Sequence, residues 1–225
     1  MISHKHKCIF IHIPKNGGTS IEVALGHLDG HQGREGQDHR SLRMIIPKHS
    51  LKIFSTWENL LEYARSKKYR YQKHLNPNNK LTVTQEQYRS YFKFSVVRNP
   101  WSRAFSWYKN VIRDEIHQRD LKITAEITLV QFLRRFIGKG MLRPQTYWIK
   151  DYENSIPLDY ICRFETLKDD FTHVCKQMGL GSLSLPHEIK GSGEDYRERY
   201  DKESIQLVAE YYQEEIKLFG YYFKE

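Results

Sequence analysis

The first strong pattern in the chain is an almost continuous apolar run at residues 8–13, which is rich in β-branched side chains. Such a run is typical of a strand buried on both faces of a parallel sheet. A glycine turn at residues 15–20 leads from it into an apolar helical segment, residues 21–28. Thr19 and Glu22 predict a capping box at the start of this helix. The pattern therefore predicts a strand, a glycine turn and a helix.

The same alternation recurs further along the chain. Residues 92–97 predict a second buried strand, and Pro100 suits the first turn of the helix that follows. Residues 160–164 predict a third strand with a helix after it, and residues 201–218 predict a last helix that Gly220 ends. Strands that alternate with helices predict an α/β fold with a central, mainly parallel sheet flanked by helices.

A long polar segment separates the first two units. Residues 30–92 are rich in glycine, histidine, lysine and arginine, with short helices expected at residues 57–67 and 84–90. A connection of this length inside a compact domain is usually functional. We expect one domain over residues 1–225, in which this basic insertion contributes to a binding site.

Composition narrows the class of protein. The chain has 225 residues, of which 39% are hydrophobic and 28% charged, and its mean hydropathy is -0.70. It contains no apolar run of the roughly 18 residues that span a bilayer and no signal-peptide pattern, which predicts a soluble, cytoplasmic chain without a membrane anchor. Cys8, Cys162 and Cys175 are widely spaced within apolar runs, so we expect buried thiols and no disulfide framework.

The charge is unevenly distributed. The net charge is +9, but residues 1–113 carry 20 basic against 7 acidic side chains, while residues 114–225 carry 16 against 20. The first half therefore holds +13 and the second half -4. This balance predicts an anionic partner and leaves nucleic acid, an anionic polysaccharide and a phosphorylated cofactor open.

The glycine turn at residues 15–20 has the composition of an anion-binding loop. Gly17 and Gly18 let the backbone approach an anion closely, and Lys15, Thr19 and Ser20 add a positive charge and two hydroxyl donors. It is not a Walker A loop, because the lysine precedes the glycines. The alternative interpretation is an ordinary tight turn before a capped helix.

The second turn carries similar chemistry with different residues. Arg98 follows the second strand, at the end where open α/β sheets bind ligands, and Ser102 and Ser106 share one face of the next helix. A guanidinium group and a helix hydroxyl match a phosphate monoester. The alternative is that Arg98 pairs with a surface carboxylate.

Together the two turns indicate a protein family more specifically than either turn does alone. The segments IHIPKNGGTS (residues 11–20) and FSVVRNPWSRAFSWY (residues 94–108) resemble the 5'-phosphosulfate and 3'-phosphate motifs of the sulfotransferase superfamily, most closely its carbohydrate sulfotransferase branch. The resemblance continues through residues 158–165 and 219–221 and excludes roughly residues 50–87. It implies a sulfotransferase fold with P-loop-like architecture and 3'-phosphoadenosine 5'-phosphosulfate as the donor, with no metal.

The resemblance also implies roles for individual residues. Arg98 and Ser106 would hold the 3'-phosphate, and Gln145 would lie near the acceptor. Lys190, Ser192 and Tyr196 are candidates for a further loop over the nucleotide. The 5'-phosphosulfate would be held by Lys15, Asn16, Gly17, Gly18, Thr19 and Ser20.

Sulfuryl transfer needs charge neutralisation at the leaving oxygen and a base for the acceptor hydroxyl. Lys15 is the candidate for the first task. His39 resembles the histidine that follows the first helix in carbohydrate sulfotransferases, so we predict that it is the base, with His49 in reserve. His12 lies inside the first strand, where a core histidine is the simpler interpretation.

The predicted function is therefore an enzyme that moves a sulfuryl group from the nucleotide donor to a hydroxyl, with an anionic saccharide as the expected acceptor because of the basic side chains near His39. Those side chains are Arg34, Arg40, Arg43 and Lys48. Two alternatives remain: a nucleotide or small-molecule kinase, which would need a metal-binding carboxylate, and a non-catalytic basic module that binds anionic glycan or nucleic acid. On the preferred interpretation no nucleic acid is bound.

Overall fold

The computed structural model describes two compact units of the chain. The first comprises Met1–Val97 and Thr146–Glu188, and the second comprises Arg98–Gln145 and Ile189–Glu225. The prediction of a single domain stays a prediction. The described residues are 1–31, 36–47, 51–181, 183–186 and 194–224.

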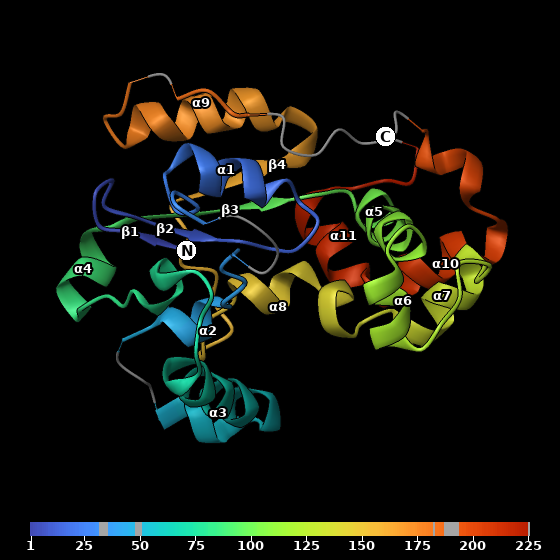
Figure 1. Ribbon diagram of the computed structural model, residues 1–225, viewed down its shortest axis with the longest axis horizontal. Coiled ribbons are helices and arrows are strands. Elements are labelled where there is room, and N and C mark those ends of the chain that lie inside the picture. The colour runs from blue at the N-terminus through green and yellow to red at the C-terminus, as the bar shows by residue number, and fades with distance from the viewer. Residues whose placement is uncertain (32–35, 48–50, 182, 187–193, 225) are drawn as a thin grey trace. The chain divides into compact units, whose positions relative to one another are not determined.

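A four-stranded sheet forms the centre of the first unit (Figure 1). Its order is β1 (Ile2–Ser3), β2 (Cys8–Ile11), β3 (Phe92–Val97) and β4 (Tyr160–Arg163). Strands β2, β3 and β4 are parallel, and β1 pairs antiparallel with β2. The predicted α/β fold with a mainly parallel sheet is confirmed, whereas the two residues of β1 are too few for an alternating pattern to reveal.

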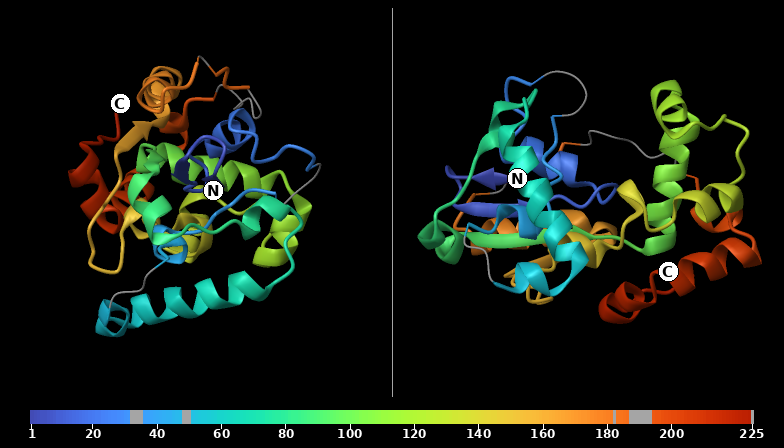
Figure 2. Two further views of the ribbon diagram at one scale, coloured as in Figure 1. Left: turned by 90° about the vertical axis from the view of Figure 1, so that its left-hand side faces the viewer. Right: turned by 90° about the horizontal axis from the view of Figure 1, so that it is seen from below.

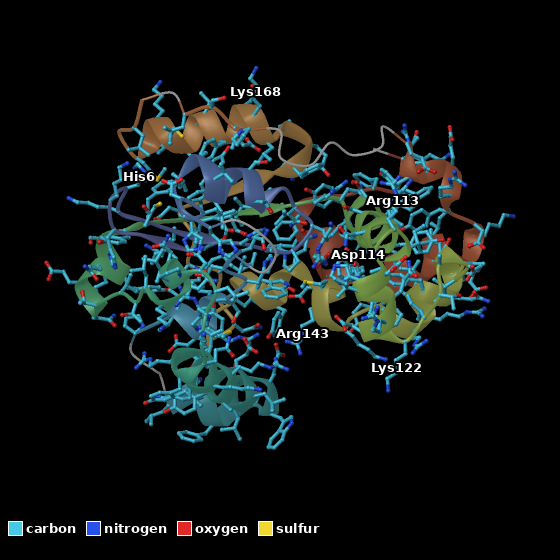
Figure 3. All side chains as sticks on the ribbon, in the orientation of Figure 1. His6, Arg113, Asp114, Lys122, Arg143 and Lys168 are labelled. Carbon is cyan, nitrogen blue, oxygen red and sulfur yellow. The ribbon has the colours of Figure 1, made fainter. Side chains whose placement is uncertain are left out.

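Helices cover both faces of this sheet. The two views in Figures 1 and 2 place α1 (Gly18–Ala24) and α9 (Leu167–Gln177) on one face, and α2 (Leu42–Ile45) and α3 (Trp57–Tyr71) on the other. Lys168 on α9 points away from the sheet in Figure 3. The remaining helices of the unit are η1 (Leu51–Ser55), η2 (Pro77–Lys80), α4 (Gln85–Ser90), η4 (Phe164–Thr166) and α8 (Gln145–Ile149), whose first residue ends the second unit.

The core of the first unit lies between the sheet and the helices α1 and α9. Ile21 of α1 and Phe171 of α9 pack with Phe10 and Phe94 of the central strands, and all four are at most 1% exposed. Burying each such side chain contributes about 2 kcal/mol. The core also encloses three free thiols, as the sequence predicts: Cys8, Cys162 and Cys175.

The second unit is helical. Its last two helices form where the sequence predicts one: the chain turns at Tyr212, whose ring is buried and whose hydroxyl donates a hydrogen bond to the Leu142 carbonyl at 2.5 Å. Gly220 ends the second of them with a φ of 67°. The helices are α5 (Pro100–Ile112), α6 (Glu115–Leu121), α7 (Leu129–Phe136), η3 (Gly140–Leu142), η5 (Tyr196–Arg199), α10 (Lys202–Tyr211) and α11 (Gln213–Phe219).

A buried arginine supports the core of the second unit. The Arg103 guanidinium, 1% exposed, donates hydrogen bonds to the carbonyls of Met141 and Arg143 on the η3 turn. Burial lowers the pKa of Arg103. Within the described residues, no helix of either unit is long and apolar enough to cross a bilayer.

Candidate active site

The loop at residues 15–20 leaves the carboxyl end of β2 and enters α1. Lys15 and Gly17 both adopt left-handed backbone conformations, with φ values of 70° and 77°. The lysine is half-buried, as are Thr19 and Ser20. A non-glycine residue with a positive φ is uncommon, and such strain is found at binding sites where the surrounding fold enforces it.

Packing explains the two glycines of the loop. A Cβ atom on Gly17 would lie 3.0 Å from the side chains of Phe164 and Leu167, and one on Gly18 would lie 2.2 Å from Cδ2 of His12. The second distance is shorter than any real contact of a Cβ atom. The backbone at Gly18 therefore runs directly against the His12 ring, where no side chain fits.

The start of α1 differs from the prediction. The N-cap residue is Gly17, which has no side chain to accept a hydrogen bond, so the predicted capping box of Thr19 and Glu22 is wrong. Glu22 is fully buried and serves another purpose, because its Oε1 accepts a hydrogen bond from the Asp38 backbone at 3.0 Å. Asn16, also buried, donates to the Val96 carbonyl at 2.6 Å and ties the loop to β3.

Two histidines and a glutamate form a cluster beside this loop. The Nδ1 atom of His12 lies 3.1 Å from Oε1 of Glu22, and the rings of His12 and His39 are 4.3 Å apart between centroids. Nδ1 of His39 lies 3.2 Å from the His12 carbonyl. A carbonyl only accepts hydrogen bonds, so Nδ1 of His39 carries the proton and the basic lone pair is on Nε2.

Burial dominates the electrostatics of the cluster. Burial and, next, the amino terminus lower the pKa of His12 to about 3. Burial and the neighbouring His12 lower the pKa of His39 to about 4, while Glu22 opposes this shift. Burial raises the pKa of Glu22. Both rings are therefore neutral at pH 7.

A buried ion pair supports the backbone next to His39. The Arg40 guanidinium lies 2.6 Å from the Asp38 carboxylate, and the amino group of Met1 lies 3.5 Å from it. Although burial raises the pKa of Asp38, the neighbouring Arg40 and the amino terminus outweigh it and hold that pKa well below its usual range. The aspartate that precedes His39 is thus a structural anion that fixes the segment carrying the histidine.

This ion pair changes the argument for an anionic acceptor. Arg40 is engaged by Asp38, and Arg43 is buried and paired with Glu58 at 2.6 Å. The sequence suggested that both guanidinium groups are available to an anionic acceptor, but both are buried and paired. The other predicted cations, Arg34 and Lys48, lie outside the described residues, as do His49, Lys190 and Ser192.

The second motif begins the second unit. The half-buried Arg98 donates from Nε to the Ser102 hydroxyl at 2.9 Å, which aligns its guanidinium along the start of α5. Ser106, also half-buried, follows one turn later on the same helix. This arrangement puts an arginine and two hydroxyls at one helix end, as the sequence predicts, and the role of Arg98 in binding a phosphate stays a prediction.

Gln145 and Glu215 fix the backbone of Arg98. The Gln145 side chain accepts from the Arg98 N–H at 2.8 Å and donates to the Arg98 carbonyl at 2.9 Å. Glu215, 1% exposed, accepts from both the backbone and the side chain of Gln145. Gln145 is fully buried as the partner of Arg98, and its expected place near the acceptor stays a prediction.

Sequence reasoning missed the roles of His12, Glu22 and Glu215. A signal existed for Glu22, because a carboxylate inside the apolar stretch at residues 21–28 predicts a buried partner. For His12 and Glu215 the partners are distant in sequence, and no local pattern identifies them. No group of three or more metal-ligating side chains occurs in the part of the chain that the structure describes.

Comparison with known proteins agrees with this geometry. The chain matches the Sulfotransferase family over residues 1–222 and belongs to that family. No solved structure matches it.

Among curated proteins, the chain is 25% identical to carbohydrate sulfotransferase 10 of Xenopus laevis over 262 residues and 23% identical to that of Homo sapiens over 256 residues. Each alignment covers 98% of this chain and 66% of the relative. Carbohydrate sulfotransferase 14 of Danio rerio is 27% identical over 113 residues, which cover 40% of this chain and 31% of that protein. The chain therefore spans just under two thirds of the length of the first two relatives.

Proposed function

We propose that this chain transfers a sulfuryl group from 3'-phosphoadenosine 5'-phosphosulfate to a hydroxyl group of a saccharide. Family membership and the names of the relatives support this assignment. The observation that carries it is the position of the His12 ring, which touches both Gly18 of the glycine loop and His39. A base candidate and an anion-binding loop thus share one buried neighbour.

The glycine loop has the features needed to bind a phosphosulfate. Gly17 and Gly18 leave the main chain of the loop without side chains, and Lys15, Thr19 and Ser20 are half-buried rather than fully solvated. A half-buried lysine interacts more strongly with an anion than a surface lysine does, because water screens it less. We assign residues 15–20 to the 5'-phosphosulfate, and Arg98 with Ser106 to the 3'-phosphate.

His39 is assigned as the base. As the acceptor oxygen forms its bond to sulfur, the bond from sulfur to the bridging oxygen of the phosphate breaks, and the acceptor proton passes to Nε2 of His39. Lys15 compensates the negative charge that develops on the bridging oxygen. Glu22 favours the imidazolium that forms, since its charge acts to raise the pKa of His39.

The low pKa of His39 has a kinetic consequence. With a pKa of about 4, the ring is already neutral and able to accept a proton at pH 5. The acid limb of the pH profile should therefore lie well below the pKa near 6.5 of an ordinary histidine.

Donor binding tests the proposal first. We expect 3'-phosphoadenosine 5'-phosphate to stabilise the protein without a divalent metal, by about 2.7 kcal/mol at a hundred times its dissociation constant, and ATP to stabilise it less. A thermal-shift titration measures both. Equal shifts with ATP, or a requirement for magnesium, would contradict the donor assignment.

Transfer from radiolabelled donor tests the chemistry. His39→Gln should retain donor binding and lose on the order of a hundredfold in turnover. His173→Gln is the matched control, because His173 lies on α9 in the same unit and packs against Tyr160. A panel of sulfated, uronic and neutral saccharides then identifies the acceptor class, for which we propose an anionic saccharide.

A further inference from the structure

A pocket lies at the amino ends of strands β2, β3 and β4, at the opposite end of the strands from the glycine loop. It has a volume of about 400 Å³ and is bordered by the turn between β1 and β2, the end of α4, the start of β3 and the end of α9. His6, labelled in Figure 3, marks this edge of the first unit. The volume is within the range of roughly 300–1,000 Å³ found for small-molecule sites.

The rim of this pocket is cationic. Lys5, Lys7 and Arg89 line it with exposed side chains, and within the described residues none of the three forms an ion pair. The one carboxylate in the lining, Asp159, is held by Lys93, whose Nζ lies 3.3 Å away and whose backbone N–H donates to it at 2.6 Å. The pocket therefore has an excess of three positive charges.

Part of the lining is apolar, and we call this part the floor of the pocket. Phe92, Met178 and Leu180 are half-buried and line it together with the buried Tyr91. Ser90 and Gln177 add hydroxyl and amide groups at its border. A pocket that bound only inorganic ions would gain nothing from such a floor, since apolar surface stabilises a ligand only when the ligand covers it with apolar atoms.

We propose that this pocket binds a saccharide that carries sulfate or carboxylate groups. A sugar ring presents C–H groups on its faces and hydroxyls around its edge, which matches an apolar floor bordered by Ser90 and Gln177. Its anionic substituents match the three cations of the rim. This binding goes beyond sulfuryl transfer and uses none of the residues assigned to the donor or the base.

The pocket is separate from the glycine loop. Lys7 directly precedes β2, whereas Lys15 follows it beyond the other end of the strand. A strand of four residues is about 13 Å long. One sugar ring therefore cannot contact both places, and only an oligosaccharide of several rings could do so.

Isothermal calorimetry with a chondroitin sulfate hexasaccharide tests the proposal. The variant Lys5→Gln/Lys7→Asn/Arg89→Gln removes the rim charges, and asparagine is chosen at Lys7 because its φ is 48°. Three exposed charge contacts worth about twofold each predict an affinity about tenfold weaker. The control Lys168→Gln/Lys202→Gln/Lys217→Gln removes three exposed charges outside the pocket and should change the affinity by less than about twofold.

Four further measurements make the result specific. Hydrogen exchange of the parent should slow at residues 5–7 and 177–180 when the hexasaccharide is bound, and binding should weaken with salt. The rim variant should keep its affinity for 3'-phosphoadenosine 5'-phosphate, which shows that it is folded and that the donor site is independent. The affinities of three other ligands then identify the source of the binding. Desulfated chondroitin measures the contribution of the carboxylates, inorganic sulfate that of the bare anion, and maltohexaose that of the neutral sugar ring.

Several outcomes would overturn the proposal: no binding by the parent, equal weakening in both triple variants, or equal affinity for maltohexaose or for inorganic sulfate. Because the readout is binding and not turnover, failure here leaves the proposed sulfuryl transfer untouched. Loss of transfer activity would equally leave this pocket unaffected.

Discussion

The pair of His12, which is buried, and His39, which is half-buried, predicts that the stability of the first unit depends on pH, and that His39→Gln removes a defined part of this dependence. The pKa of His39 falls from 6.5 to about 4 on folding. Below pH 6.5 the unfolded chain therefore binds a proton that the folded chain excludes. The contribution of His39 to the free energy of unfolding is fully present above pH 6.5 and is lost as the pH falls toward 4.

The magnitude follows from the shift. Each such histidine contributes a slope of up to about 1.4 kcal/mol per pH unit below its unfolded pKa, or about 2 kcal/mol between pH 7 and pH 5. His12, with a pKa of about 3, has the same effect over this range. Lowering the pH from 7 to 5 therefore reduces the free energy of unfolding by about 4 kcal/mol through the two histidines together. Glu22 opposes the trend because its pKa is raised, and since His39 acts to lower that pKa the variant also changes this opposing contribution. The pKa values of Asp38 and His27 are also shifted, but His39 is not among the main causes of either shift, so both are common to parent and variant.

Hydrogen exchange provides the assay. The slowest amides of β2 and β3, corrected for the intrinsic pH dependence of exchange, report the opening of the first unit by itself. The parent should lose about 2 kcal/mol more between pH 7 and pH 5 than His39→Gln does. Any stability that His39→Gln loses through poorer packing cancels, because each protein is compared with itself at two pH values. Equal pH dependence in both proteins would show that His39 protonates like a solvated histidine.

Three other predictions concern the loop, the two phosphate contacts and the second unit. Gly18→Ala should destabilise the first unit by about 2 kcal/mol and abolish donor binding, because its Cβ would overlap His12. Gly181→Ala, where the Cβ meets open space, should leave both stability and donor binding unchanged, and a thermal-shift titration measures both variants. Steady-state kinetics should separate Lys15→Ala, which reduces mainly kcat, from Arg98→Ala, which weakens mainly donor binding; unchanged donor affinity in Arg98→Ala would mean that the second motif is misassigned. Arg103→Met leaves the carbonyls of Met141 and Arg143 unpaired and should cost about 3 kcal/mol in chemical denaturation of the second unit, a loss that a stability within 1 kcal/mol of the parent would contradict.

Much of the fold was predictable because its two central strands are buried. An almost continuous apolar run at residues 8–13 and an alternating pattern that ends in two valines at residues 92–97 identify β2 and β3. Pro100 at the start of α5 and Gly220 at the end of α11 are likewise local signals that the structure confirms.

The chemistry of the site was only partly predictable, because it depends on contacts between segments far apart in sequence. The apolar environment of His12 indicates burial, but nothing near it indicates that His39 lies against its ring. Arg40 and Arg43 count as positive charge in any composition, yet they are neutralised by Asp38 and Glu58 in the folded chain. A count of basic residues thus overstates the number of free cations that the folded chain presents to a ligand.

The short strand β1 has a consequence for the solubility of the chain. Its two residues pair with Ile9 and Cys8, and the Met1 carbonyl accepts from the Phe10 amide, so the outer edge of the fully buried strand β2 is covered. An uncovered apolar edge strand is a template for pairing with other chains. Strand β1 therefore protects β2 from pairing with other chains. Deleting residues 1–4 should produce protein that associates through β2 before its helices unfold.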